Sequence, residues 1–94
     1  MLKARDKKIL RAQAQQNRSL FQIGKDGISD NLIATLDDSL RAHELVKLNL
    51  LKTAPLSTAE AAAMLAQATD SELVHSIGRT FVLYRRSKKN LMGL

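Results

Sequence analysis

The chain has 94 residues, of which 45% are hydrophobic and none is cysteine, and it carries a formal net charge of +6 with a pI near 10.1. This length predicts one domain spanning residues 1–94, and this composition excludes a disordered chain, a disulfide framework and a thiolate metal site. Because no signal-peptide h-region and no apolar run near the roughly 18 residues of a membrane span are present, we expect a soluble cytoplasmic protein.

The first half of the chain predicts two helix–strand pairs. Residues 3–16 are rich in helix formers, and their thin apolar content places this helix on the outside of the domain. Residues 20–23 form a short strand that ends at Gly24. An amphipathic helix follows, and its apolar face consists of Leu32, Ile33, Leu36 and Leu40. Residues 45–51 then alternate as a second strand.

The second half predicts one helix and a hairpin. Residues 57–60, Ser-Thr-Ala-Glu, form a capping box that begins a helix reaching Ala68. This helix is expected to bury Ala61, Met64 and Leu65. Residues 72–77 and 80–84 predict two strands, joined by the two-residue turn Gly78-Arg79.

The order α-β-α-β-α-β-β predicts a two-layer α+β fold with a small mixed four-stranded sheet. Strands joined through a helix are expected to pair in parallel, and the last two strands to pair antiparallel. Ligands of open α/β sheets gather beyond the carboxyl ends of the parallel strands. Three loops leave strands there, and their cations are Lys25, Lys52 and Arg79. Arg85 and Arg86 end the last strand, so we expect them at the opposite end, near Arg18.

Gly24-Lys25-Asp26-Gly27 is a G-x-x-G loop between the first strand and the next helix. Glycine permits positive φ and close approach of a ligand to the main chain, and Ser29 follows as an N-cap, so the positive helix end points to the same place. KH domains hold single-stranded nucleic acid with such a loop. The alternative is a strand-to-helix turn that uses two glycines for its backbone alone. Asp26 is expected to accept a hydrogen bond that stabilises the turn.

Charge is segregated along the chain. Residues 1–25 carry seven cations and one acid, residues 26–78 carry three cations and eight acids, and residues 79–94 carry five cations and no acid. Such segregation gives either a basic side that attracts polyanions or a solvated basic tail at each end. Cations at helical spacing near the N-terminus are Lys3, Lys7, Arg11 and Arg18. Lys47, on a strand, is either solvated or a phosphate contact.

The remaining candidate side chains do not indicate an enzyme. Two histidines without cysteine do not readily form a zinc site, and no paired-carboxylate, nucleophile or Walker motif is present, so we expect neither an enzyme nor a cofactor. His43 is expected to interact with a helix C-terminus, and His75 to be a packing or edge residue. Phe81 is expected in the core, whereas Tyr84 can offer a stacking face. With three aromatic residues, base stacking is not expected to dominate affinity.

Three segments resemble the CRM domain (chloroplast RNA splicing and ribosome maturation) in order and spacing: LFQIGKDGI at 20–28, HELVK at 43–47 and IGRTFVLYR at 77–85. The resemblance spans nearly the whole chain and is greatest to the stand-alone bacterial YhbY-type proteins. It implies a fold similar to the C-terminal domain of bacterial translation initiation factor three. It also implies an RNA-binding protein that associates with 23S-type rRNA in large-subunit precursors and assists ribosome assembly.

By the same resemblance, residues 24–27 are the family's G-x-x-G loop, and Arg79 and Arg85 are its cations. The tail at 87–94 departs from the family because it is short and lacks proline, so its contacts stay unassigned. Together, the charge and the resemblance predict a monomer that binds RNA through Gly24, Lys25, Asp26, Gly27, Lys47, Lys52, Arg79, Arg85, Arg86, Lys7, Arg11 and Arg18.

Two alternatives from other classes remain open. One is a protein-interaction module that docks a basic ribosomal protein on an acidic middle segment, which contains Asp30, Asp37, Asp38 and Glu44. The other is a DNA-binding domain of the winged or KH type. A basic surface alone does not distinguish RNA from DNA.

Overall fold

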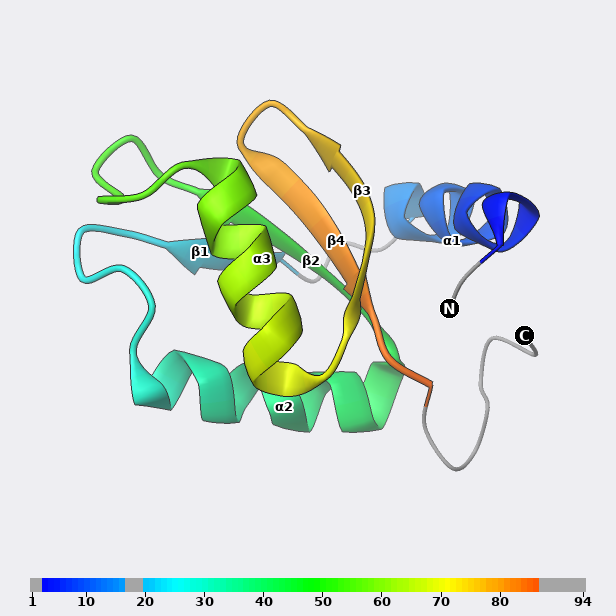
Figure 1. Cartoon of the computed structure of the whole chain (residues 1–94), viewed down its shortest axis with the longest axis horizontal. Helices are drawn as coiled ribbons and strands as arrows, with labels where there is room; N and C mark the ends of the chain where they lie inside the picture. The colour runs from blue at the N-terminus through cyan, green and yellow to red at the C-terminus, as the bar shows by residue number, and fades with distance from the viewer. Residues whose placement is uncertain (1–2, 17–19, 87–94) are drawn as a thin grey trace.

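A computed structural model of the chain describes residues 3–16 and 20–86 and places three helices around a four-stranded sheet (Figure 1). The elements in chain order are α1 (Ala4–Gln16), β1 (Leu20–Ile23), α2 (Asp30–His43), β2 (Leu45–Leu50), α3 (Thr58–Thr69), β3 (Glu72–Ile77) and β4 (Thr80–Tyr84). The α+β class and the element order predicted from the sequence are confirmed.

The strand order is β1-β2-β4-β3. β1 pairs with β2 in parallel, and β4 pairs antiparallel with both β2 and β3. The prediction of parallel pairing across a helix therefore holds for β1 and β2 but is wrong for β2 and β3, which are separated by β4. The reason is burial: all four residues from Phe81 to Tyr84 are buried, so β4 takes the central position.

Each face of the sheet has its own core. α2 and α3 lie together on one face (Figure 1), where their apolar side chains pack against those of the sheet, among them Leu48, Phe81 and Leu83. The other face carries a smaller cluster, in which Leu10 and Ala14 of α1 pack against Leu45, Val74, Val82 and Tyr84. α1 therefore covers part of the second face of the sheet.

Two sequence-based predictions about single side chains are wrong. Met64 is 52% exposed, because the buried residues of α3 repeat at helical spacing on another side of the helix, at Ala61, Ala62, Leu65 and Thr69. Tyr84 is buried against α1 and offers no stacking face. Burial raises the pKa of its phenol, and the nearby charge of Glu44 adds to this effect. The prediction of Phe81 as a core residue is confirmed.

Side-chain caps begin both helices that cover the first face. Ser29 accepts a hydrogen bond from the Leu32 N–H at 3.1 Å. Ser57 and Glu60 form both halves of the predicted capping box. Hydrogen bonding to Ser57 holds the pKa of the Glu60 carboxyl below its usual value. The sequence signals for both helix starts are thus confirmed.

Only the second glycine of the G-x-x-G loop has a backbone that favours glycine. Gly27 has φ +65°, and a Cβ added there would lie 3.2 Å from the Pro55 Cγ. At Gly24, φ is not positive, and an added Cβ would lie 3.6 Å from the Leu51 Cδ1, an ordinary contact. The two glycines therefore have different roles.

We expect Gly27→Ala to destabilise the fold by about 1–2 kcal/mol, because a non-glycine residue is strained at this φ. A loss of this size lowers Tm by about 4–8 °C per kcal/mol in a domain of this length. Gly24→Ala is the matched control and should leave Tm nearly unchanged. Thermal unfolding followed by circular dichroism measures both, and equal losses would contradict the assignment.

Candidate nucleic-acid interface

Backbone hydrogen bonds join three loops at the carboxyl end of β1 and β2. The Leu51 N–H donates to the Ile23 carbonyl at 2.9 Å, and the Leu50 N–H donates to the Arg79 carbonyl at 2.8 Å. Both bonds are donated at the end of β2, by its last residue and the one after it, so the loops after β1 and β3 are held beside the loop after β2. We call this region the loop end; it consists of residues 24–29, 51–57 and 78–79.

The loop end brings together the three cations expected there. Lys25, Lys52 and Arg79 are all exposed, and each lies on a different one of the three loops. Among residues 3–16 and 20–86, none of these three side chains forms an ion pair. Their charges are thus available to a partner, and Asp26 is the one acidic residue among the residues of the loop end.

The two residues between the glycines of the G-x-x-G loop, Lys25 and Asp26, are exposed. The turn of this loop is closed by a backbone bond from the Gly27 N–H to the Gly24 carbonyl at 3.0 Å. Within the described part of the chain, the predicted hydrogen bond to the Asp26 side chain is not found, and the N–H groups of Lys25, Asp26 and Ile28 have no protein acceptor. Free N–H groups beside the start of a helix form a favourable environment for an anion.

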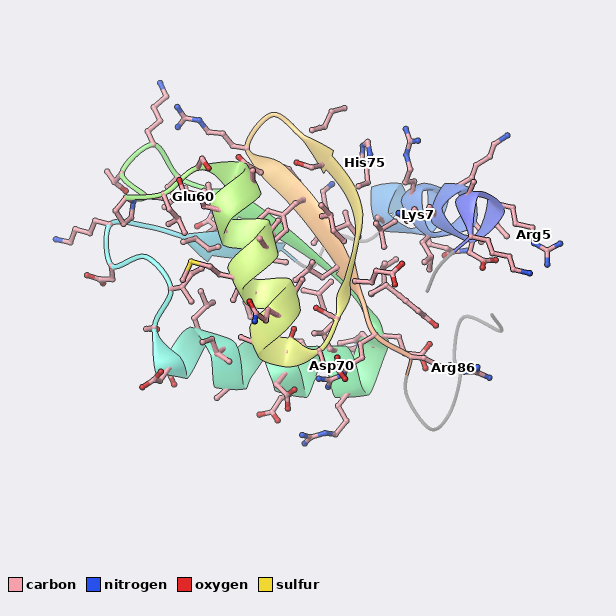
Figure 2. The ribbon with its side chains drawn as sticks, viewed as in Figure 1. Arg5, Lys7, Glu60, Asp70, His75 and Arg86 are labelled. Atoms are coloured by element: carbon pink, nitrogen blue, oxygen red, sulfur yellow. The ribbon has the colours of Figure 1, made fainter. Side chains whose placement is uncertain are left out.

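Arg85 does not join the exposed cations. Its guanidinium donates to the Asp37 carboxylate, to the Asp37 carbonyl at 3.0 Å and to the Thr69 carbonyl at 2.7 Å. These bonds fasten the end of β4 to α2 and α3, so the side chain that the resemblance assigns to RNA is engaged within the fold. Arg86 is exposed at the end of the sheet opposite the loop end, as expected (Figure 2).

Asp37→Asn should destabilise the fold at neutral pH. The hydrogen bond from Arg85 lowers the pKa of the Asp37 carboxyl, and the charges of Arg85 and Arg41 add to this shift. Because the folded-state pKa is lowered, the stabilisation is present above the unfolded-state pKa of about 3.9 and is lost as pH falls through the folded-state value.

Urea unfolding of the wild type and Asp37→Asn at pH 7 and in strong acid measures this effect. The difference in midpoint should be clear at pH 7 and small in acid. Asp38→Asn is the matched control, because the Asp38 side chain is 74% exposed and, among the residues that the structure describes, pairs with Arg41 alone, at 3.4 Å. A pH-independent difference, or an equal effect of the control, would contradict the role of the Asp37–Arg85 pair.

α1 places a second group of cations on the other face of the sheet. A hollow of about 580 Å³ between α1 and β3 is lined by Ala4, Lys7, Lys8, Arg11, Ala12 and Val74; we call it the α1 groove. Its three cations include two that the sequence predicted, Lys7 and Arg11, and one that it did not, Lys8. The predicted contact Arg18 lies outside the described residues.

A smaller hollow of about 190 Å³ continues from the α1 groove over the sheet. It is lined by Arg11, Ala14, Lys47, His75, Ile77, Thr80 and Val82; we call it the sheet groove. Lys47 is half-buried here. The groove also contains His75 and Ile77, which the sequence did not connect with Lys47. His75 is half-buried on the edge strand β3, as expected of a packing or edge residue. Its position in the sheet groove follows from the bulged pairing of β3 with β4, which the sequence does not reveal.

The acidic surface required by the protein-docking alternative is incomplete. Glu44 is fully buried, and Asp37 is engaged with Arg85 and Arg41. Only Asp30 and Asp38 of the four acids are exposed. The residues described also contain no group of three or more potential metal ligands and no helix long and apolar enough to cross a membrane.

Comparison with known proteins identifies the family. The sequence model of the CRS1 / YhbY (CRM) domain matches residues 2–85. The chain belongs to the CRM domain family. The resemblance detected in its three segments is therefore confirmed.

Relatives share both sequence and structure with this CRM protein. It is 38% identical over 90 residues to the probable RNA-binding protein YqeI of Bacillus subtilis, covering 96% of this chain and 94% of the relative. The probable RNA-binding protein MJ0652 of Methanocaldococcus jannaschii is 35% identical over 81 residues, which are 84% of this chain and 60% of the relative. The chain is also similar to the solution structure of SAV1595 from Staphylococcus aureus, a candidate RNA-binding protein, with a TM-score of 0.81 and 42% sequence identity. The match covers 98% of this chain and 96% of the SAV1595 chain.

Proposed function

We propose that this protein binds rRNA in precursors of the large ribosomal subunit and assists their assembly without catalysing a reaction. The names of its relatives support RNA as the partner. The observation that carries the proposal is the loop end, where three exposed cations from three loops lie beside free N–H groups at the start of α2. The protein acts in the cytoplasm as one domain over residues 1–94, as a monomer and without a cofactor.

The loop end recognises the phosphate backbone. Phosphate oxygens accept hydrogen bonds from the N–H groups of Lys25, Asp26 and Ile28, and the positive end of α2 adds to the attraction. Lys25, Lys52 and Arg79 contribute charge. Their binding to phosphates releases counterions from the RNA, and the free-energy gain from this release falls as the salt concentration rises. Phosphate contacts of this kind position a nucleic acid but carry little sequence information, so selectivity comes from RNA shape.

We assign the predicted cations to the interface according to whether their side chains are exposed or engaged within the fold. Lys7 and Arg11 of the α1 groove extend the basic surface to the second face of the sheet, and Arg86 contributes from the opposite end. Arg85 is left out because its guanidinium is engaged by Asp37 and Thr69. A general DNA-binding domain is the competing function, and a preference for A-form RNA over duplex DNA of equal length distinguishes the two, since 2′-hydroxyls and groove shape differ.

Replacing Lys25, Lys52 and Arg79 together with Gln should weaken binding of an rRNA hairpin more than tenfold at moderate salt. Each lost phosphate contact should also reduce the slope of log affinity against log salt by about one. Fluorescence anisotropy between about 50 and 200 mM salt measures both quantities.

The matched control is Arg41→Gln, an exposed cation on α2 that pairs with Asp37 and Asp38. It should leave the salt slope unchanged. Wild-type affinity that is flat over this salt range would contradict the phosphate mechanism. An unchanged slope in the triple variant would remove the loop end from the interface.

A further inference from the structure

The second face of the sheet is only partly covered. α1 contacts β2 and β3 and packs over Leu45, Val74, Val82 and Tyr84. Beyond this cluster, toward the loop end, the sheet groove remains open between α1 and the strands. Its volume of about 190 Å³ is below the roughly 300–1,000 Å³ of small-molecule pockets. A single planar group fits this space better than a large ligand.

The lining of the sheet groove combines an apolar floor with positive sides. Val82 and Ala14 are buried and form the floor, whereas Ile77 is 66% exposed at the rim. Arg11 and Lys47 supply two positive charges, and among the described lining residues none is acidic. The Thr80 hydroxyl donates to the Asn49 Oδ1 at 3.1 Å, which leaves its oxygen able to accept another hydrogen bond.

His75 supplies the one aromatic ring of this lining. It is half-buried, and Figure 2 shows it on the side of β3 that faces α1. The bulge between Leu73 and His75 places it opposite Val82, beside the apolar floor. Histidine rings and Arg guanidinium planes are surfaces on which unpaired RNA bases stack.

We propose that the sheet groove binds one unpaired nucleotide of the RNA, with its base stacked against His75 over Val82 and its phosphate beside Arg11 and Lys47. This inference rests on the proposed function. A paired base does not fit, because its faces and its pairing edge are covered within the duplex. The groove therefore selects RNA that has an unpaired nucleotide next to a helix.

The position of the groove supports this occupant. Arg11 lines both the α1 groove and the sheet groove. At the other side, Thr80 directly follows Arg79 of the loop end. A strand whose phosphates contact both basic regions thus passes over the sheet groove. The exposed Ile77 on edge strand β3 could also contact an apolar strand of a partner protein. The continuous positive charge favours a nucleotide as the occupant instead.

Two RNAs and two histidine variants test the proposal. One RNA is a blunt hairpin whose loop is replaced by a non-nucleotide linker, so that it has no unpaired base, and the other is the same hairpin with a short unpaired tail. His75→Ala should lower affinity for the tailed hairpin about fivefold or more, which is the lower range for loss of one base–aromatic stack, and should leave affinity for the blunt hairpin unchanged. His43→Ala is the matched control, because His43 is exposed at the end of α2, and it should change neither affinity.

NMR of the wild type provides a second readout that needs no variant. The sequence has two histidines, so two sets of imidazole signals are followed, and the tailed hairpin should shift those of His75 but not those of His43. Equal affinity of both RNAs, or tailed-RNA binding without a shift at His75, would overturn the nucleotide site while leaving the proposed function intact. Failure of the wild type to bind either RNA would overturn both.

Discussion

The burial of β4 on both faces determines how the other elements are arranged. Phe81 and Leu83 pack under α2 and α3, while Val82 and Tyr84 need cover on the other side. A continuous apolar strand of this kind is typical of a sheet with both faces covered, and here it lies between β2 and β3. β3 is consequently at the edge, and α1 is required on the second face. Because α1 covers only the part of that face around Tyr84, the sheet groove stays open near Thr80.

The two ends of the sheet use arginine in different ways. At the loop end, the backbone of Arg79 bonds to β2, and its side chain is left exposed. At the opposite end, the Arg85 guanidinium donates hydrogen bonds to Asp37 and Thr69, and so holds the helices against the sheet. The first arrangement offers charge to a polyanion, and the second stabilises the fold. The sequence alone does not distinguish the exposed charge of Arg79 from the engaged charge of Arg85.

Local signals explain why much of the fold was predictable. The capping box at 57–60, the glycine hairpin turn at 78–79 and the alternation of β2 each depend on neighbouring residues. The site was predictable to the extent that parallel strands bring their exit loops together, which places Lys25 beside Lys52.

Three of the errors involve partners distant in sequence. The engagement of Arg85 depends on Asp37, 48 residues away. The burial of Tyr84 depends on where α1 packs, and the separation of β2 from β3 depends on which strand has the greatest burial. The sheet groove was not predictable for the same reason, since it unites α1 with three strands through the bulge in β3.

We propose that the loop end holds the protein on precursors of the large ribosomal subunit. Sedimentation of tagged protein through a sucrose gradient of cell lysate tests it most directly, with the wild type compared with a variant in which Lys25, Lys52 and Arg79 are replaced by Glu. The wild type should comigrate with large-subunit precursors at low salt and be released as the salt concentration rises, while the variant should stay at the top of the gradient. Wild-type protein at the top at every salt concentration, or a variant that comigrates equally well, would contradict it.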